Sequence, residues 1–217
     1  MPQEPAIRIE GLGKRFISHW ILAHLDLKIL PGESIALFGS NGCGKSTLLK
    51  IIGTLFEPTC GQVSVFGQDV RKDKKKIRAC LRFLGHDKQF YPSLTLRENL
   101  ELIASLLGLK KNDPSIESAL DRLGIGPLAH RHFEEVSEGM KKRLALAKML
   151  LGESDLILLD EPYPSLDSAS KEILNGLIRQ WRSEKKTLLM ASHDHEQTLP
   201  HVDRVFVLEK GRLKETR

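Results

Sequence analysis

One nine-residue segment restricts the fold more than any other part of this 217-residue chain. Residues 39–47 read GSNGCGKST, and they follow a short strand-forming run and precede a helical pattern. A glycine-rich loop between a strand and a helix presents backbone N–H groups and the helix N-terminus to phosphate, while the lysine reaches the outer phosphates. The segment therefore predicts an α/β fold that binds a nucleoside triphosphate.

The side chains of this glycine-rich loop suit distinct parts of a triphosphate. Lys45 is expected to be catalytic at the outer phosphates, and the hydroxyls of Ser46 and Thr47 are expected to reach phosphate and Mg²⁺. Cys43 is either a thiol that makes the activity sensitive to modification or simply a small side chain in a tight loop. The residues expected to contact the nucleotide here are Gly39, Ser40, Asn41, Gly42, Cys43, Gly44, Lys45, Ser46 and Thr47.

Two later apolar runs lead into side chains that can do chemistry. The run 156–159 is followed by Asp160 and Glu161, and the run 187–191 is followed after one serine by His193. Because ligands gather at the carboxyl ends of parallel strands, these side chains are expected beside the glycine-rich loop. Asp160 would hold Mg²⁺ together with Ser46, Glu161 would accept a proton from an attacking water, and His193 would hydrogen-bond the γ-phosphate. The alternative is that the two acids are solvated turn residues.

The first third of the chain favours strands. Short β-favouring runs occupy residues 7–9, 22–29 and 34–38. Gly11 and Gly13 are expected to separate the first two runs, because glycine punctuates strand patterns. This part of the sequence predicts an antiparallel β subdomain.

The rest of the chain changes from helices to alternating strands and helices. Capping residues predict helix starts at Thr95, Asp113 and Ser137, and a later helix is expected to be capped by Ser168. Unbroken apolar strands alternating with helices indicate a parallel sheet covered on both faces. We therefore expect one domain over 1–217, with an α/β core and its β subdomain in about 1–85 and 152–217, and an inserted helical subdomain in about 86–151.

Composition and charge narrow the class of protein. The chain is 41% hydrophobic, yet it has no apolar run near the roughly 20 residues that cross a bilayer and no pattern of a signal peptide. We therefore expect a cytosolic protein unless a partner holds it elsewhere. The net charge is +5, and the basic run at 71–78 suits either a nucleic acid, an anionic lipid surface or a solvated helix face. No aromatic residues interleave with that run, which disfavours nucleic acid.

Cysteines and histidines give little support for a metal other than magnesium. The three cysteines are scattered without metal-type spacing, which predicts a reduced compartment and no disulfide. His130 with His132, and His193 with His195, resemble the start of a zinc pattern. Neither pair is followed by further ligands at a recognisable spacing.

Five motifs in a fixed order make the chain resemble the ATP-binding subunit of an ABC transporter over nearly its whole length. They are the glycine-rich Walker A loop, the signature region VSEGMKKRLALAKMLL (136–151), the Walker B segment LILLDEP (156–162), the D-loop PSLD (164–167) and the histidine of ASHD (191–194). The resemblance implies a P-loop NTPase core that binds ATP and Mg²⁺ and hydrolyses ATP. The Asn-Lys-x-Asp motif of GTPases does not occur. A small-molecule kinase would need neither the signature turn nor the histidine at the strand end.

The resemblance also implies a composite site. Two subunits would stack head to tail as a homodimer, so that Ser137 and Gly139 of one close over the γ-phosphate held by the other, while Asp167 communicates across the dimer. An aromatic side chain usually stacks on adenine just before the second strand. Phe16 fits that place, Trp20 is a second choice, and core packing is the alternative for both.

The sequence departs from the family pattern at three positions. The family usually has a glutamine where the core meets the helical subdomain, whereas LGHDKQFYPSLTLRENL (84–100) places Asp87 there as a Mg²⁺ ligand and Gln89 two residues later. Glu138 replaces the usual glycine or serine of the signature, and Met140 replaces its glutamine. Which of Asp87 and Gln89 fills the glutamine role stays open.

Within the family, the motifs resemble exporter subunits most. The 84–100 segment and the Ser-x-Gly-Met signature are similar to the ATPase of the haem exporter of cytochrome c maturation, and next to drug, polysaccharide or lipid exporters. The resemblance implies a separate transmembrane subunit as partner, a place on the inner face of the cell membrane through that partner, and no direct contact with nucleic acid. A soluble relative acting on ribosomes or DNA is the third alternative.

Overall fold

The computed structural model describes residues 4–85, 90–110, 112–164 and 166–217. The chain divides into two compact units. We call the first the core unit, which comprises Met1–Gly85, Ser154–Pro162 and Ile178–Arg217, and the second the helical unit, which comprises His86–Glu153 and Tyr163–Leu177. The functional boundaries predicted from the sequence, at about 86 and 151, stay a prediction.

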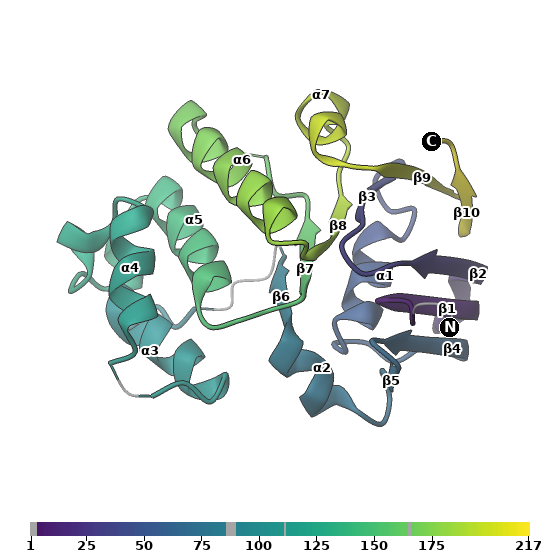
Figure 1. Ribbon diagram of the computed structural model, residues 1–217, viewed down its shortest axis with the longest axis horizontal. Coiled ribbons are helices and arrows are strands. Elements are labelled where there is room, and N and C mark those ends of the chain that lie inside the picture. The colour runs from purple at the N-terminus through teal and green to yellow at the C-terminus, as the bar shows by residue number, and fades with distance from the viewer. Residues whose placement is uncertain (1–3, 86–89, 111, 165) are drawn as a thin grey trace. The chain divides into compact units, whose positions relative to one another are not determined.

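The core unit contains a six-stranded sheet in the order β10-β9-β3-β8-β7-β6 (Figure 1). All neighbours pair in parallel except the terminal hairpin of β9 and β10. Every residue of β3, β7 and β8 is buried, as expected for the central strands of a parallel sheet. The strands are β3 (Ser34–Phe38), β6 (Leu81–Leu84), β7 (Leu156–Asp160), β8 (Thr187–Ala191), β9 (Arg204–Glu209) and β10 (Arg212–Glu215).

A second sheet of the core unit is antiparallel, in the order β2-β1-β4-β5. Its strands are β1 (Ile7–Phe16), β2 (His19–Ile29), β4 (Cys60–Val65) and β5 (Gln68–Asp69). The predicted α/β class, with a parallel core sheet, an antiparallel β subdomain and additional helices, is confirmed.

The prediction that Gly11 and Gly13 separate two strands is wrong. Both lie inside β1, where the pairing register with β2 shifts between Ile9 and Leu12 and again after Leu12. A side chain at Gly13 would overlap the space of Trp20 and Cys60. Glycine therefore marks bulges and a close approach here, not a strand end, and β1 continues to Phe16.

In the described part of the chain, three short α-helices lie wholly in the core unit, α1 (Lys45–Ile52), α2 (Lys74–Cys80) and α7 (His195–Thr198), together with a 3₁₀ turn at Leu199–His201. α1 starts at the end of the glycine-rich loop and buries Leu48, Leu49, Ile51 and Ile52 in the main hydrophobic core. This anchoring fixes the N-terminus of the helix, which is the part that faces a bound phosphate.

Much of the basic run at 71–78 is bound to the protein itself. Arg71 donates to the carbonyl oxygens of Gly61 and Pro58, Lys74 pairs with Glu57 at 2.6 Å, and Arg78 donates to Thr54. These contacts hold three of the basic side chains against the core unit.

The helical unit contains α3 (Leu96–Leu106), α4 (Pro114–Arg122), α5 (Glu138–Ala147), the first part of α6 (Ser168–Ser183) and three 3₁₀ turns at Gly126–Leu128, Phe133–Glu135 and Lys148–Leu150. The predicted starts of α3, α4 and α5 are confirmed: Thr95 forms a capping box with Glu98, and Asp113 and Ser137 accept backbone N–H bonds. Within the described ranges, none of the helices combines the length and hydrophobicity that crossing a bilayer requires.

The predicted cap of α6 is wrong by one residue. Ser168 is the first residue of the helix, and Oδ1 of Asp167 accepts the N–H of Ser170 at 2.7 Å. Aspartate and serine are equally good caps, so residue type alone could not decide between the two neighbours.

Candidate functional site

The glycine-rich loop connects β3 to α1 in the backbone conformation that glycine permits. Gly39, Gly42 and Gly44 have φ values of 152°, 78° and 112°. A side chain at Gly39 would overlap the carbonyl oxygen of Leu208, and one at Gly44 would come within 2.7 Å of Leu22. These glycines let the backbone turn tightly between two strands and a helix, which leaves the N–H groups of the loop to line a phosphate cradle.

Lys45 lies at the centre of this cradle. Its side chain is only 6% exposed, and its Nζ donates to the carbonyl oxygens of Gly39 at 2.7 Å and Ser40 at 3.3 Å. The same Nζ lies 3.7 Å from Oε1 of Glu161. A buried ammonium surrounded by oxygen atoms can exchange some of these partners for phosphate oxygens at little cost.

Ser46 and Asp160 form the part of the site that suits Mg²⁺. They are 114 residues apart in sequence, yet the Ser46 Oγ donates to Asp160 Oδ1 at 2.9 Å. Asp160 ends β7 and is 2% exposed, which does not fit a solvated turn residue. Mg²⁺ prefers one or two oxygen ligands from protein and completes its shell with phosphate and water, so this pair fits the ion. Asp87, the third predicted ligand, and Gln89 lie outside the described residues.

Glu161 lies between Lys45 and His193 and contacts both. Its backbone has φ 50°, and its N–H donates to the Ala191 carbonyl at 2.8 Å. Its Oε2 accepts hydrogen bonds from Nδ1 of His193 at 2.7 Å and from the His193 N–H at 3.3 Å. The Glu161 side chain is 11% exposed and that of His193 is 58% exposed. Glu161 is therefore fixed by its backbone and by its neighbours, which again excludes a freely solvated turn.

Phe16 and Trp20 lie in different surroundings. Phe16 is 41% exposed, contacts Phe56 edge to face at 5.6 Å, and has the Lys14 Nζ 4.8 Å from its ring centre. Trp20 is 52% exposed and lies against Gly13, with Arg15 5.7 Å from its ring. Arg15 lies against Trp20, and residues 15 and 16 of a strand point to opposite faces. Trp20 and Phe16 therefore lie on opposite faces of the sheet.

The Phe16 face is the one beside α1. Phe56 follows that helix, and its N–H donates to the carbonyl of Lys50. Phe16 therefore lies beside the segment that follows the C-terminal end of α1, and the choice between Phe16 and Trp20 as the residue that stacks on adenine stays a prediction. Lys14 and Phe56 were not predicted as neighbours of Phe16; the alternation of Lys14 and Phe16 along one strand face was the available signal for Lys14.

The signature residues belong to the helical unit, where they begin α5. The Ser137 Oγ accepts the N–H of Met140 at 3.3 Å, and a side chain at Gly139 would meet nothing closer than that hydroxyl, at 3.9 Å. Glu138 is exposed and pairs with Lys141 at 2.9 Å, one turn along the helix. This helix start therefore presents its small residues to open space.

Asp167, which caps α6, is the other predicted residue of the helical unit. Its Oδ2 lies 3.6 Å from the Arg143 guanidinium, and its side chain is 60% exposed. The hydrogen bonds from Ser170, followed by the charge of Arg143, lower the pKa of this carboxyl. Asp167 is therefore charged and fixed in direction at the protein surface.

The two histidine pairs do not gather metal ligands. His193 bonds Glu161, while the ring of His195 stacks on Phe38, and His132 bonds the carbonyl of Ser93. Among the described residues there is no group of three or more His, Cys, Asp or Glu that could hold a metal ion. Zinc therefore gains no support.

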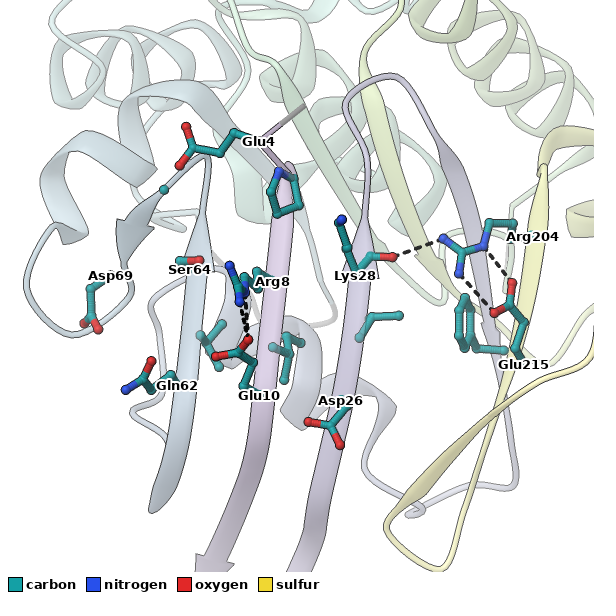
Figure 2. Close-up of a pocket in the computed structure, with 16 residues that line it drawn as sticks. Glu4, Arg8, Glu10, Asp26, Lys28, Gln62, Ser64, Asp69, Arg204 and Glu215 are labelled. Atoms are coloured by element: carbon teal, nitrogen blue, oxygen red, sulfur yellow. Dashed lines mark hydrogen bonds and ion pairs between the residues drawn. The ribbon is translucent and has the colours of Figure 1, made fainter. Parts of the chain in front are cut away.

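A hollow of about 1120 Å³ on the core unit lies apart from the predicted residues (Figure 2). β1, β2, β4 and the terminal hairpin line it, and none of the predicted nucleotide-binding or catalytic residues does. Figure 2 shows its charged side chains pairing with each other, Arg8 with Glu10 at 2.6 Å and Arg204 with Glu215 at 2.7 Å. These pairs indicate a solvated polar sheet surface.

Comparison with known proteins agrees with this geometry. The family model described as "ABC transporter" matches residues 22–164. The ABC transporter ATP-binding protein NatA of Bacillus subtilis is 33% identical over 87% of this chain and 78% of its own length. The aliphatic sulfonates import ATP-binding protein SsuB of Zymomonas mobilis is 34% identical over 96% and 84%, respectively. The bacitracin transport ATP-binding protein BcrA of Bacillus licheniformis is 31% identical over 96% and 68%.

Solved structures give the same answer. The ATP-binding cassette MJ0796, in a dimeric post-hydrolysis state with ADP and phosphate, matches with a TM-score of 0.86 and 25% identity over 97% of this chain and 98% of that one. An ATP-binding subunit of an ABC transporter matches with a TM-score of 0.89 and 25% identity over 97% and 89%. The chain therefore belongs to the ABC transporter family, as an ATP-binding subunit whose activity is the hydrolysis of ATP coupled to transport.

Proposed function

We propose that this subunit hydrolyses ATP with Glu161 as the general base, Lys45 at the outer phosphates and His193 at the γ-phosphate. The observation that carries the proposal is the position of the Glu161 carboxylate, 3.7 Å from the Lys45 Nζ through one oxygen and 2.7 Å from the His193 Nδ1 through the other. A nearly buried carboxylate held between a cation and an imidazole supports proton transfer at a defined place.

In the proposed reaction, Glu161 accepts a proton from water while the water oxygen bonds to the γ-phosphorus. The bond from that phosphorus to the bridging oxygen of ADP breaks, and Lys45 compensates the charge on the phosphate oxygens. Since a carboxylate only accepts, the Nδ1–H of His193 donates to Glu161 and orients it. Nε2 is the ring nitrogen proposed to meet the γ-phosphate, and because phosphate oxygens also accept, this role requires a second proton on Nε2, so that His193 acts as an imidazolium. Ser46 and Asp160 would hold Mg²⁺, which would further neutralise the phosphate charge when bound.

The complete site is proposed to need two copies of the chain. Ser137 and Gly139 begin α5 with an exposed helix start, and this arrangement suits an anion brought by another surface. A solved relative of high structural similarity is described as dimeric with ADP and phosphate. We therefore propose a head-to-tail homodimer in which the signature of one copy covers the triphosphate held by the other, with the exposed Asp167 reaching the partner.

The transport partner is proposed to be a separate transmembrane subunit that holds this chain on the inner face of the cell membrane. The relatives named for sulfonate import and bacitracin transport differ in substrate, so the shared ATP-binding sequence does not identify what is transported. Haem export for cytochrome c maturation is the specific proposal, and it rests on the 84–100 segment and the Ser-x-Gly-Met signature alone. Drug, polysaccharide or lipid export is the alternative.

The decisive experiment replaces Glu161 by Gln, which keeps the shape but cannot accept a proton. We expect ATP binding to remain and turnover to fall by about 10² to 10⁴, with the ATP-bound dimer accumulating on size-exclusion chromatography. The matched control is Glu209→Gln, an exposed glutamate at the end of β9, which should turn over normally. Normal turnover by Glu161→Gln would show that the base is elsewhere.

A further inference from the structure

The segment that follows β8 contacts β3 beyond the last residues that pair in the sheet. β3 and β8 pair in parallel up to Leu37 and Ala191, and the Ser192 N–H then donates to the Leu37 carbonyl at 3.1 Å. Phe38 is the last residue before the glycine-rich loop, and the ring of His195 stacks on it. The ring centres are 3.8 Å apart and the planes differ by 11°.

The stack closes a small apolar cluster that lies apart from the main core. Phe38 packs there with Ala36, Val202 and Val205, and it is only 2% exposed. His195 is itself exposed, so it covers the cluster from the solvent side. Loss of the imidazole would open Phe38 to water and remove a direct contact between α7 and the residue that leads into the phosphate cradle.

His193 lies on the short segment 192–195, between the hydrogen bond of Ser192 to Leu37 and the stack of His195 on Phe38. The N–H of Asp194 donates to Ser192 Oγ at 3.0 Å, and Asp194 Oδ1 accepts the N–H of Gln197 at 3.0 Å. α7 has four residues, too few for a helix to be stable by itself. The orientation of this segment therefore depends on the contacts at its two ends. These contacts are to Leu37 and Phe38 of β3.

We propose that His195 is a positioning residue: stacked on Phe38, it fixes His193, and through His193 the Glu161 carboxylate, relative to the phosphate cradle. The inference rests on the proposed function, because it assumes that His193 and Glu161 act on the γ-phosphate and the attacking water. What it adds is that an aromatic ring, and not its charge, is required at position 195.

The test compares His195→Ala, which removes the ring, with His195→Phe, which keeps a ring that can stack. For His195→Ala we expect kcat to fall about 3- to 10-fold, the fold-change to which the coupling of an aromatic pair corresponds. The affinity for ATP without Mg²⁺, measured by fluorescent nucleotide titration, should stay within about twofold because the cradle itself is unchanged. His195→Phe should restore kcat, and its pH–rate profile should superimpose on that of the wild type.

A structural readout accompanies the kinetics. In the wild type, the ring current of Phe38 should shift the His195 ring protons upfield in NMR spectra, and Phe38→Leu should abolish that shift. Phe38→Leu should also lower kcat, and the double variant with His195→Ala should be no worse than either single one, because both remove the same contact. The control His130→Ala, at an exposed histidine of the helical unit, should leave kcat unchanged.

The proposal is overturned by wild-type kcat in His195→Ala, or by a kcat in His195→Phe as low as in His195→Ala. An equal loss of ATP affinity and kcat in His195→Ala would also overturn it, since that pattern indicates a general disturbance of the loop. Failure of the proposed function is recognised separately, by normal turnover of Glu161→Gln. If Glu161→Gln is inactive while His195→Ala is normal, the positioning role of His195 is wrong and the proposed function stands.

Discussion

The phosphate cradle of the core unit and the signature of the helical unit are both glycine-containing starts of helices, but they are built differently. In the cradle, Lys45 is 6% exposed and already bonded to two carbonyl oxygens, and Asp160 is 2% exposed and bonded to Ser46. In the signature, Glu138 has an exposed side chain, and Gly139 faces open space. A site that is preorganised by its own chain can bind ligand alone, whereas an exposed one needs a partner to exclude water.

The largest expected effect tests that comparison by separating the two halves of the site. Lys45→Ala and Ser137→Ala should each abolish turnover, by at least about 10²-fold, since each removes a group proposed at the triphosphate. An equal mixture should recover about a quarter of wild-type activity, because half of the dimers are mixed and each mixed dimer has one intact site. Steady-state ATPase assays of the mixture, with each variant alone as control, check this. No recovery, or full turnover by a monomer, would contradict the composite site.

The sequence predicted the cradle better than its surroundings. Lys45, Ser46, Asp160, Glu161 and His193 were expected at one sheet edge. The structure brings Glu161 into contact with both Lys45 and His193, and Ser46 into contact with Asp160. Their proximity was predictable because parallel strands end at the same edge, so strand and motif together fix the location. Their chemical roles stay predictions.

What the sequence did not predict depends on contacts between distant segments. β6 (Leu81–Leu84) is only four residues long and contains Arg82, so it cannot be distinguished from helix or loop until it pairs with β7. The sequence alone predicts that Gly13 interrupts a strand. Only the structure shows that the Trp20 ring and the Cys60 thiol pack closely against it. Nothing in the local sequence pairs Phe38 with His195, because residues so far apart share no periodicity.

The next largest effect is expected at Lys148 in the helical unit, whose side chain is about as buried as that of Lys45. Lys148 is 8% exposed, and burial lowers its pKa to about 8 from an ordinary value of 10.5. The unfolded chain therefore binds more protons between these two pH values, and the free energy of unfolding should rise as pH increases from about 8 to about 10.5. Lys148→Met should remove this rise and stabilise the protein at pH 7 by on the order of 3 kcal/mol.

Chemical denaturation at several pH values measures this difference. The control is Lys141→Met, which removes a lysine paired at the surface and should leave the pH dependence of stability unchanged. If Lys148→Met and wild type keep parallel pH profiles above pH 8, the ammonium of Lys148 is better solvated than its burial indicates.

A smaller effect concerns the base of the nucleotide. Phe16→Ala should weaken ATP binding about 5- to 10-fold, since one aromatic stack on a base contributes about 1 to 3 kcal/mol and part of it is replaced by solvent. Trp20→Ala, on the opposite face of the sheet, is the matched control and should bind ATP as the wild type does. Nucleotide titrations with ATP and with inorganic triphosphate check the point, because only ATP should distinguish the variants. The reverse pattern, with Trp20→Ala impaired, would assign the base to the other face.

The smallest effect is expected at Glu138, the acidic residue inside the signature. Its carboxylate pairs with Lys141 at 2.9 Å and is exposed, so Glu138→Gln should change the free energy of unfolding by less than about 0.5 kcal/mol. Turnover should stay within about twofold, because a carboxylate directed along its own helix would lie away from the triphosphate that we propose the partner copy holds. Lys141→Met provides the control: freeing Glu138 from its partner should slow ATP hydrolysis, since the carboxylate can then approach the phosphates and repel them. A rate increase of tenfold or more in Glu138→Gln would instead place the native carboxylate against the phosphates, and the signature would then repel its ligand until another group neutralises it.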